Sequence, residues 1–449
     1  MKKVTKKLMW IFAIGQLGWS ILAGIIVNWL VYFYQPVDEL VANGHTVYVS
    51  QGTIIFGLFT LIGLITALGR IFDAVTDPLI ASASDRCTHK RGRRIPFLRA
   101  SALPFAILTV LIFVPPVAGQ SLINNIWLFV SVMLFYLLMT IYCTPYSALI
   151  PELARNQDDK INISTYISIT FLLGTALAYG APFIWDIFIG GGMDRMAAIR
   201  LTFIILAVIA FLCMMVPALF INEKDYINVE PSKSKAFDSL LKTFKNKHFR
   251  IFVLSDIFYW IALTMFQTGL PFFVVRLLGL EETMITILFL LMTLVSFLFY
   301  IPVNIIAKKI GKKKLVMAAF IFFAFTFFVA SLSGMTFIPN VIHGYLISIL
   351  AAIPMAILGI LPQAMVADIA QYESAQTNEN REGMFFAART FAFKMGQSIA
   401  MVFFTSFAVI GKETGLGYRL ALVAAIVFSI LGAVVLHFYD EDKILKRIS

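Results

Sequence analysis

The sequence predicts an all-α membrane protein whose twelve transmembrane helices form two bundles of six. Hydrophobic residues occupy 60% of its 449 positions, and the mean hydropathy is +0.87. Charged residues amount to 14%, well below the roughly 25% that soluble domains carry. The apolar residues are also gathered in runs of about 20 or more, the length that a helix needs to cross a bilayer. Together these observations exclude a soluble fold.

Each predicted helix corresponds to one apolar run. The first run follows a short basic segment, but it is too long for a signal peptide and lacks a small-residue cleavage site, so we expect it to remain as a helix. The predicted helices cover residues 8–34, 53–82, 95–117, 123–150, 163–188, 199–221, 249–275, 284–306, 315–334, 341–368, 384–410 and 417–438.

The longest hydrophilic stretch separates the sixth run from the seventh. It predicts a first six-helix domain over residues 1–222, a cytoplasmic linker over 223–248 and a second six-helix domain over 249–449. Most Lys and Arg residues lie in loops on the side that also holds both termini, so the net charge of +11 indicates cytoplasmic termini rather than a nucleic-acid partner. We expect a multi-pass protein of the plasma membrane, most simply a bacterial inner membrane, and a monomer.

The second predicted helix carries a charged stripe. Arg70, Asp73 and Asp77 fall within a sector about 60° wide on a helix that turns about 100° per residue. A charge at bilayer depth costs from about 3 to more than 10 kcal/mol, so this stripe needs compensation. Two carboxylates one turn apart suit either Na⁺ or a shared proton. The alternative is an ion pair between Arg70 and Asp73 with no transported cation, which leaves Asp77 without a partner.

The fourth predicted helix carries small polar side chains on one face. These are Thr140, Cys143, Thr144 and Ser147, spaced by three and four residues. Such a face either packs closely against another helix or forms a neutral cavity wall, and both can hold.

Two further helices offer candidate substrate contacts. Lys394 lies about ten residues inside the eleventh predicted helix with Gln397 on the same face, where it needs an anionic partner unless it reaches the headgroups. Gln16, Trp19 and Ser20 share a face of the first helix, and the Trp could either stack on a sugar ring or lie at the membrane interface.

The two halves echo each other in their basic loops. Residues 85–94 and 308–314 are both basic, contain a glycine and connect the second and third helices of their half. Such a repeat of six helices fits the parallel-repeat major facilitator architecture, with a binding site near the midplane.

Three sequence blocks resemble the glycoside–pentoside–hexuronide cation symporters, and the resemblance covers essentially the whole chain. The first block is Arg70-x-x-Asp73-x-x-x-Asp77-Pro78 with Asp85 and Gly92-Arg93-Arg94. The second is residues 140–151, which end in Pro-Tyr-Ser-Ala-Leu-Ile-Pro. The third is Ala367-Asp368 with Tyr372, Arg381-Glu382-Gly383 and Lys394-x-x-Gln397.

The resemblance implies cation-coupled symport of a sugar, a glycoside or an acidic sugar by alternating access. It places the coupling cation, Na⁺ or H⁺, at Asp73, Asp77, Thr76 and Thr140. It also implies a network of charges that latches the cytoplasmic side. The network residues are Arg70, Asp85, Arg93, Arg94, Asp368, Arg381 and Glu382. The alternative is that these are ordinary solvated loop charges. No cofactor and no further metal is expected.

The substrate half departs from the family pattern. Ser20 and Cys143 stand where galactoside-binding members have carboxylates, Ser147 replaces an aromatic residue and Ser168 replaces an arginine. Because Lys394 is kept, an anionic sugar becomes the more plausible substrate. The alternative is a lysophospholipid-type carrier, since animal relatives share the Asp-x-x-x-Asp-Pro block and the Pro-Tyr-Ser-Ala-Leu text. An enzyme is not expected, because three unrelated cysteines and five scattered histidines give no catalytic or zinc pattern.

Overall fold

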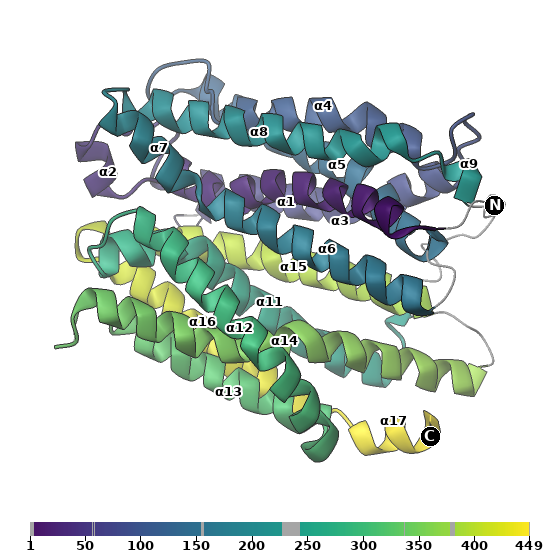
Figure 1. The fold of residues 1–449 in the computed structure, drawn as a ribbon. Helices are drawn as coiled ribbons and strands as arrows, with labels where there is room; N and C mark the ends of the chain where they lie inside the picture. Colours follow the sequence, from purple (N-terminus) through teal and green to yellow (C-terminus); the bar gives the residue numbers. More distant parts are fainter. Residues whose placement is uncertain are drawn as a thin grey trace. The chain divides into compact units, whose positions relative to one another are not determined.

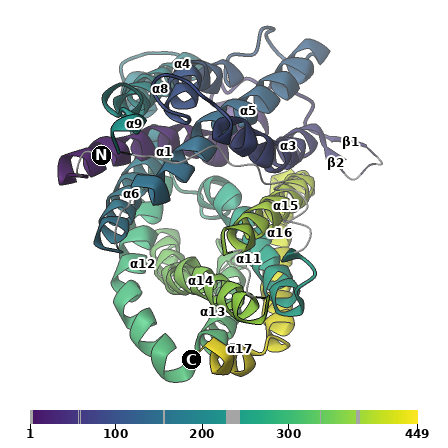
Figure 2. The same cartoon turned by 90° about the vertical axis from the view of Figure 1, so that its right-hand side faces the viewer.

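The computed structural model describes residues 4–55, 57, 59–153, 157–226, 243–335, 337–377 and 382–448. Helices dominate the described residues (Figure 1), and one small two-stranded hairpin, seen in Figure 2, interrupts them. The elements up to residue 226 are α1 (Lys6–Tyr34), α2 (Asp38–Ala42), β1 (Thr53–Ile55), β2 (Phe59–Thr60), α3 (Leu61–Asp85), α4 (Ile95–Ile112), α5 (Leu122–Leu153), α6 (Gln157–Tyr179), α7 (Ala181–Gly190), α8 (Arg195–Phe220) and α9 (Glu223–Tyr226).

The elements after residue 242 complete the chain. They are α11 (Lys247–Phe272), which continues as the π-helical segment η1 (Phe273–Leu277), α12 (Thr283–Ile310), α13 (Lys312–Ser331), α14 (Asn340–Thr377), α15 (Glu382–Ala408), the short 3₁₀ segment η2 (Lys412–Thr414), α16 (Leu416–His437) and α17 (Glu441–Ile448). Most of the predicted linker lies outside the described residues, and so does Arg381.

The helical membrane fold is confirmed, but the expected twelve apolar spans number eleven. Within the described residues, eleven helices are long and apolar enough to cross a membrane. The remaining predicted span forms α3, whose 25 residues include Arg70, Asp73 and Asp77. These charges, rather than any shortness of the helix, set α3 apart from the other long helices.

The start of the predicted span 53–82 is wrong. Residues Thr53–Ile55 pair antiparallel with Phe59–Thr60, and Thr53 lies opposite Thr60. Gly57 between the strands has a φ of 64°, a conformation that glycine adopts without strain and that allows the tight reversal. Thr60 then starts α3, because its side-chain oxygen accepts a hydrogen bond from the Gly63 amide at 3.2 Å.

The single helix predicted over residues 163–188 counts as one membrane-length span, but it is divided at Gly180 into two helices. α6 ends at Tyr179, and α7 restarts at Ala181 with Pro182 in its first turn. Proline has no amide hydrogen to continue the α6 ladder, but it is tolerated at a helix start, so the chain breaks and restarts there.

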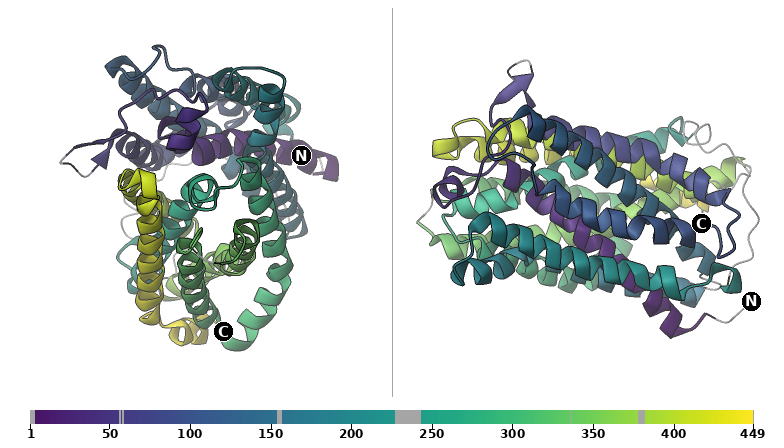
Figure 3. Two further views of the ribbon diagram at one scale, coloured as in Figure 1. Left: turned by 90° about the vertical axis from the view of Figure 1, so that its left-hand side faces the viewer. Right: turned by 90° about the horizontal axis from the view of Figure 1, so that it is seen from above.

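The chain folds as two compact units. The first unit is Met1–Gly52 with Leu68–Ser234, and the second is Thr53–Ala67 with Lys235–Ser449. In the first unit α1 packs on α6 and α8, and α4 packs on α5 and α8. In the second unit α11 packs on α15 and α16, and α13 packs on α14 and α16. Figure 2 views α11, α13 and α14 roughly along their axes, and Figure 3 gives two further views.

Each unit stabilises the start of one helix in the same way. In the first unit the Glu223 carboxylate accepts hydrogen bonds from the amides of Arg94 and Ile95, at 2.8 and 3.3 Å. These amides belong to the first turn of α4, whose donors have no partner within the helix. A carboxylate there also interacts favourably with the helix dipole.

The second unit repeats this cap at the start of α13. The Glu441 carboxylate accepts hydrogen bonds from the amides of Lys312 and Lys313, at 2.8 and 3.1 Å. Lys312 and Glu441 are 129 residues apart, as are Arg94 and Glu223. The basic loops that suggested an internal repeat thus share a local structure as well as a composition.

A glycine precedes each capped helix because the carboxylate approaches it closely. Gly92 has a φ of 116°, and a Cβ built on it would lie 2.3 Å from Glu223 Oε2. Gly311 has a φ of 92°, and its Cβ would lie 2.8 Å from Glu441 Oε2.

We predict that Gly92→Ala lowers the melting temperature of the purified protein more than Gly119→Ala does. Both glycines have positive φ angles, but only Gly92 faces a carboxylate, whereas Gly119 has open space around its Cβ position. The backbone strain of roughly 1–2 kcal/mol is common to both, so the difference measures the collision with Glu223. Thermal unfolding in detergent checks this, and equal shifts would contradict the importance of the cap.

Candidate functional site

Two hydrogen bonds join the charged stripe of α3 to α5. Thr140 Oγ1 donates to Asp73 Oδ1 at 2.7 Å, and Thr144 Oγ1 donates to Asp77 Oδ1 at 3.0 Å. The partners are 67 residues apart in both bonds, so one helical turn on α3 matches one turn on α5. Asp73 and Thr140 are each 1% exposed.

Thr76 completes this cluster of oxygens. Its Oγ1 lies 3.3 Å from Thr140 Oγ1 and donates to its own helix at the Phe72 carbonyl, at 2.9 Å. The structure therefore brings together the residues predicted for the cation, namely Asp73, Thr76, Asp77 and Thr140. It adds Thr144, which the sequence assigned to the substrate. Carboxylate and hydroxyl oxygens are the ligands that hard cations prefer.

Arg70 lies on an aromatic ring beside this cluster. Its guanidinium carbon is 5.1 Å from the centroid of the Tyr136 ring, which is one turn before Thr140. The same ring leaves no room for a side chain at Gly69, where a Cβ would approach it to 2.5 Å. Among the described residues the Arg70 Nε has no hydrogen-bond partner, and the guanidinium lies over the ring. A cation over a tyrosine face is stabilised by the ring quadrupole.

The helix-one candidates pair with each other. Gln16 Nε2 donates to Ser20 Oγ at 3.0 Å, and Ser20 Oγ donates to the Gln16 carbonyl at 2.6 Å. Both residues are buried. Trp19 points elsewhere, with its ring centroid 6.4 Å from that of Phe171. The three residues predicted as one substrate face therefore divide into a closed polar pair and an aromatic contact.

On α5 the predicted polar face is only partly buried. Cys143 and Thr144 are half-buried, and Ser147 is exposed. The buried side chains of this segment are Tyr142 and Tyr146, which the sequence reasoning missed. They donate to the carbonyls of Met214 and Phe12, at 3.0 and 2.8 Å, and so attach α5 to α8 and α1. Their spacing of four residues was the available signal.

Three predicted network residues of the first unit meet at the ends of α3 and α4. Arg94 Nη2 contacts Asp85 Oδ1 and Glu152 Oε1, both at 2.7 Å, and Arg93 Nη2 reaches the same Glu152 oxygen at 3.1 Å. Burial lowers the pKa of Arg94, but the hydrogen bond and charge of Glu152, with Asp85 and Glu223, outweigh it and raise the pKa. Glu152 and Glu223 were missed, because only the fold shows which acids reach this point.

The second unit holds a smaller network. Asp368 Oδ2 pairs with Lys312 Nζ, next to the capped start of α13. Glu382 is the first residue of α15. Lys394 is buried on α15, and Gln397 is half-buried one turn further along.

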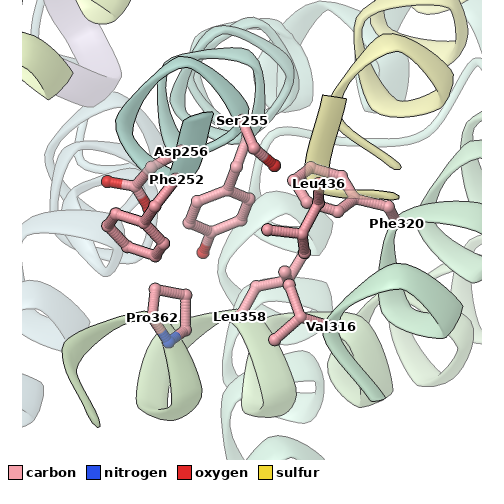
Figure 4. A pocket seen from close by; sticks show the side chains of 9 residues that line it. Phe252, Ser255, Asp256, Val316, Phe320, Leu358, Pro362 and Leu436 are labelled. Carbon is pink, nitrogen blue, oxygen red and sulfur yellow. The ribbon is translucent and has the colours of Figure 1, made fainter. Parts of the chain in front are cut away.

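The second unit also contains a buried ion pair that the sequence analysis did not identify. Arg389 Nε contacts Asp256 Oδ2 at 2.8 Å, and Arg389 Nη2 contacts Asp256 Oδ1 at 3.0 Å. The two residues are 7% and 4% exposed. Figure 4 shows Asp256 at the wall of a cavity of about 10 Å³, close to the space that one water needs. An Asp within one apolar helix and an Arg within another were the available signals.

We predict that Arg389→Met destabilises the second unit by about 3–5 kcal/mol, because it leaves the Asp256 carboxylate buried without its counter-charge. The double variant Asp256→Asn with Arg389→Met should recover part of this loss, since neither charge then remains. Thermal unfolding of the single and double variants checks the coupling. Additive losses in the double variant would show that the two residues act independently.

Comparison with known proteins places the chain in a family. The family described as "MFS/sugar transport protein" matches residues 11–443. An uncharacterized symporter of Synechocystis is 30% identical over 160 residues, which cover 34% of this chain and 26% of the relative. The isoprimeverose transporter of Lactiplantibacillus pentosus is 23% identical over 353 residues, covering 77% of this chain and 72% of the relative.

A second group of relatives and the solved structures complete the comparison. A sodium-dependent lysophosphatidylcholine symporter of Danio rerio is 24% identical over 394 residues, covering 78% of this chain and 71% of the relative. The crystal structure of a mutant of the nucleoside transporter NupG superposes with a TM-score of 0.68 at 12% identity, covering 97% of this chain and 100% of that chain, which confirms the major facilitator fold. The chain therefore belongs to the MFS/sugar transport protein family of membrane transporters, as its resemblance to the glycoside–pentoside–hexuronide cation symporters led us to expect.

Proposed function

We propose that the protein is a cation-coupled symporter that carries a sugar, a glycoside or an acidic sugar by alternating access. The observation that carries the proposal is the pairing of Asp73 and Asp77 with Thr140 and Thr144 inside the first unit. Family membership supports a transporter of this kind, and the relatives named as symporters, one of them sodium-dependent, support cation coupling.

The carboxylate pair is suited to load a cation. Asp73 is buried, and Asp77 is half-buried one turn away, so two negative charges would repel each other at close range. A Na⁺ ion held by Asp73, Asp77, Thr76 and Thr140, or a proton on one carboxyl group, removes this repulsion. Loading of the cation then orders the neighbouring part of α5, which includes the predicted substrate residues Cys143 and Thr144.

The charge networks supply the latches that alternating access requires. We assign the latch of the first unit to Asp85, Arg93 and Arg94 with Glu152, and that of the second unit to Asp368 with Lys312. Glu382, the first residue of α15, was predicted for the same network, and Arg381 lies outside the described residues. Breaking such ion pairs at the ends of helices and forming them again changes the side from which the site is reached.

The second candidate function is a cation-coupled lysophospholipid carrier. The lysophosphatidylcholine relative aligns over most of this chain, and the carboxylates expected for a galactoside are absent. Ser20, which stands at one of these positions, is bonded to Gln16. The substrate panel below separates the two functions.

We predict that Asp73→Asn and Asp77→Asn each abolish gradient-driven accumulation. The measurement is uptake into proteoliposomes with imposed Na⁺ or proton gradients, using isoprimeverose, D-xylose, D-glucuronate and lysophosphatidylcholine. Asp194→Asn is the matched control, because that carboxylate caps α8 through the amides of Met196 and Ala197 and lies outside the stripe. Accumulation that persists unchanged in both stripe variants refutes the cation assignment, and uptake of the lysolipid alone favours the second function.

We predict that Thr140→Val raises the concentration of the coupling cation needed for half-maximal uptake by about tenfold. The substitution removes the hydroxyl that donates to Asp73 Oδ1 and leaves a charged acceptor without this donor. Thr109→Val is the control, because Thr109 is similarly buried and its hydroxyl donates to the Phe105 carbonyl of its own helix. Equal cation dependence of uptake in both variants would show that Thr140 does not take part in cation binding.

A further inference from the structure

Helices α11 and α15 of the second unit meet in a ladder of matched side chains. Asp256 pairs with Arg389 through two charged hydrogen bonds. One turn further, the Trp260 ring stacks on Phe393, with centroids 4.6 Å apart and planes inclined by 24°. The last rung joins Thr268 to Met401, whose sulfur accepts from Thr268 Oγ1 at 3.7 Å.

The rungs share a single sequence offset. Residues 256 and 389 are 133 apart, and so are residues 268 and 401. The two helices therefore run in the same direction and stay in register over three turns. Gly396 permits this close packing, because a Cβ built there would lie 3.0 Å from the Ile257 carbonyl oxygen.

The rung between the aromatic stack and the Thr268 contact is polar. By the same offset it consists of Thr264 and Gln397. Among the described residues, Thr264 Oγ1 and Gln397 Oε1 are buried atoms without a hydrogen-bond partner, and so is Trp260 Nε1 one turn away. Leaving buried polar atoms unpaired costs free energy. Three such atoms along the contact between α11 and α15 therefore indicate a hydrogen-bonding partner that the two helices do not supply.

Thr264 differs from other buried threonines of this protein. A helical threonine usually satisfies its hydroxyl by donating to the carbonyl four residues earlier. Thr109, Thr202, Thr326 and Thr405 all do so, at 2.8 to 3.0 Å. Thr264 is 2% exposed and has no such bond, so its hydroxyl is free to serve another group.

We propose that Trp260, Thr264 and Gln397 form a subsite of the second unit that binds hydroxyl groups of the transported sugar. This inference rests on the proposed sugar symport. The indole N–H only donates, the threonine hydroxyl both donates and accepts, and the Gln397 amide oxygen accepts. A neutral hydroxyl group satisfies such a set, because it also donates and accepts.

A phosphate or carboxylate fits this rung less well. Both only accept hydrogen bonds when ionised, so either would leave the Gln397 oxygen unpaired. Neither nearby cation offers a free charge for an anion, because two nitrogens of Arg389 bond to Asp256 and Lys394, three residues before Gln397, already has an interaction of its own. The cavity beside Asp256 has about 10 Å³, which is too small for a sugar. We therefore assign the hydroxyl-binding groups to the rung of Thr264 and Gln397 rather than to the ion pair.

The test measures uptake kinetics of the full-length protein in proteoliposomes with isoprimeverose, D-xylose and D-glucuronate as probes. Thr264→Val, Gln397→Met and Trp260→Phe each remove one polar group, and the last keeps an aromatic ring against Phe393. Thr268→Val is the matched control, because its hydroxyl already bonds to Met401. Each subsite variant should raise KM about threefold to tenfold, the effect of one lost hydrogen bond, with its cation dependence unchanged. The control should keep the KM of the unmodified protein.

Two further readouts separate ligand binding from a structural role. Thr264→Val should keep or raise the melting temperature, because it removes an unpaired buried hydroxyl, whereas a structural hydroxyl would lower it on removal. Monodeoxy derivatives of xylose should bind the unmodified protein more weakly than xylose does. For Thr264→Val, the derivative that lacks the hydroxyl bound by Thr264 should bind as well as xylose does, because the hydrogen bond is already lost.

The outcomes are distinct. If the protein takes up a sugar and all three variants keep its KM within about twofold, a change smaller than one hydrogen bond supplies, the subsite proposal is overturned and sugar transport stands. If the unmodified protein takes up none of the three sugars under either gradient, sugar transport fails, and the subsite fails with it.

Discussion

A buried carboxylate in an apolar helix must be met by hydrogen-bond donors or by a positive charge, and this constraint organises both units. In the first unit, Asp73 and Asp77 of α3 are met by hydroxyl groups of α5. In the second, Asp256 of α11 is met by the guanidinium of Arg389 on α15. The two solutions have different consequences. Hydroxyl donors leave the negative charge in place, so it can attract a cation, whereas the guanidinium neutralises it. The first pair of helices is therefore suited to bind an ion, and the second is suited to hold two helices in register.

Much of the fold could be predicted from the sequence because the bilayer sets a simple rule of length and polarity. The apolar runs gave the long helices, and the basic glycine loops indicated the repeat that the matched caps of α4 and α13 display. The errors arose where local chemistry overrode hydropathy. Gly57 turned an apolar run into a hairpin before α3, and Pro182 divided one predicted helix into α6 and α7.

The candidate site was predictable on α3, where three charges stand out against apolar neighbours. Its partners on α5 were harder to predict, because only the register of two packed helices shows which hydroxyl meets a carboxylate. Thr144 illustrates this, since its type suited a substrate wall equally well until Asp77 was seen beside it. Arg389 and Asp256 were missed for the same reason. Each looks like an isolated charge in the sequence, and only the packing of α11 on α15 shows that they form one pair.

The two carboxylate caps impose an order on folding during synthesis. Glu223 follows the start of α4 by 129 residues, and Glu441 follows the start of α13 by the same distance. A ribosome therefore releases α4 long before the residue that completes its first turn, and the same holds for α13. Because domains generally fold as units during synthesis, with the N-terminal one first, the first bundle can close once α8 and Glu223 have emerged. The second bundle must wait until Glu441 has been made, so a translation that is interrupted before this residue leaves the start of α13 without its cap.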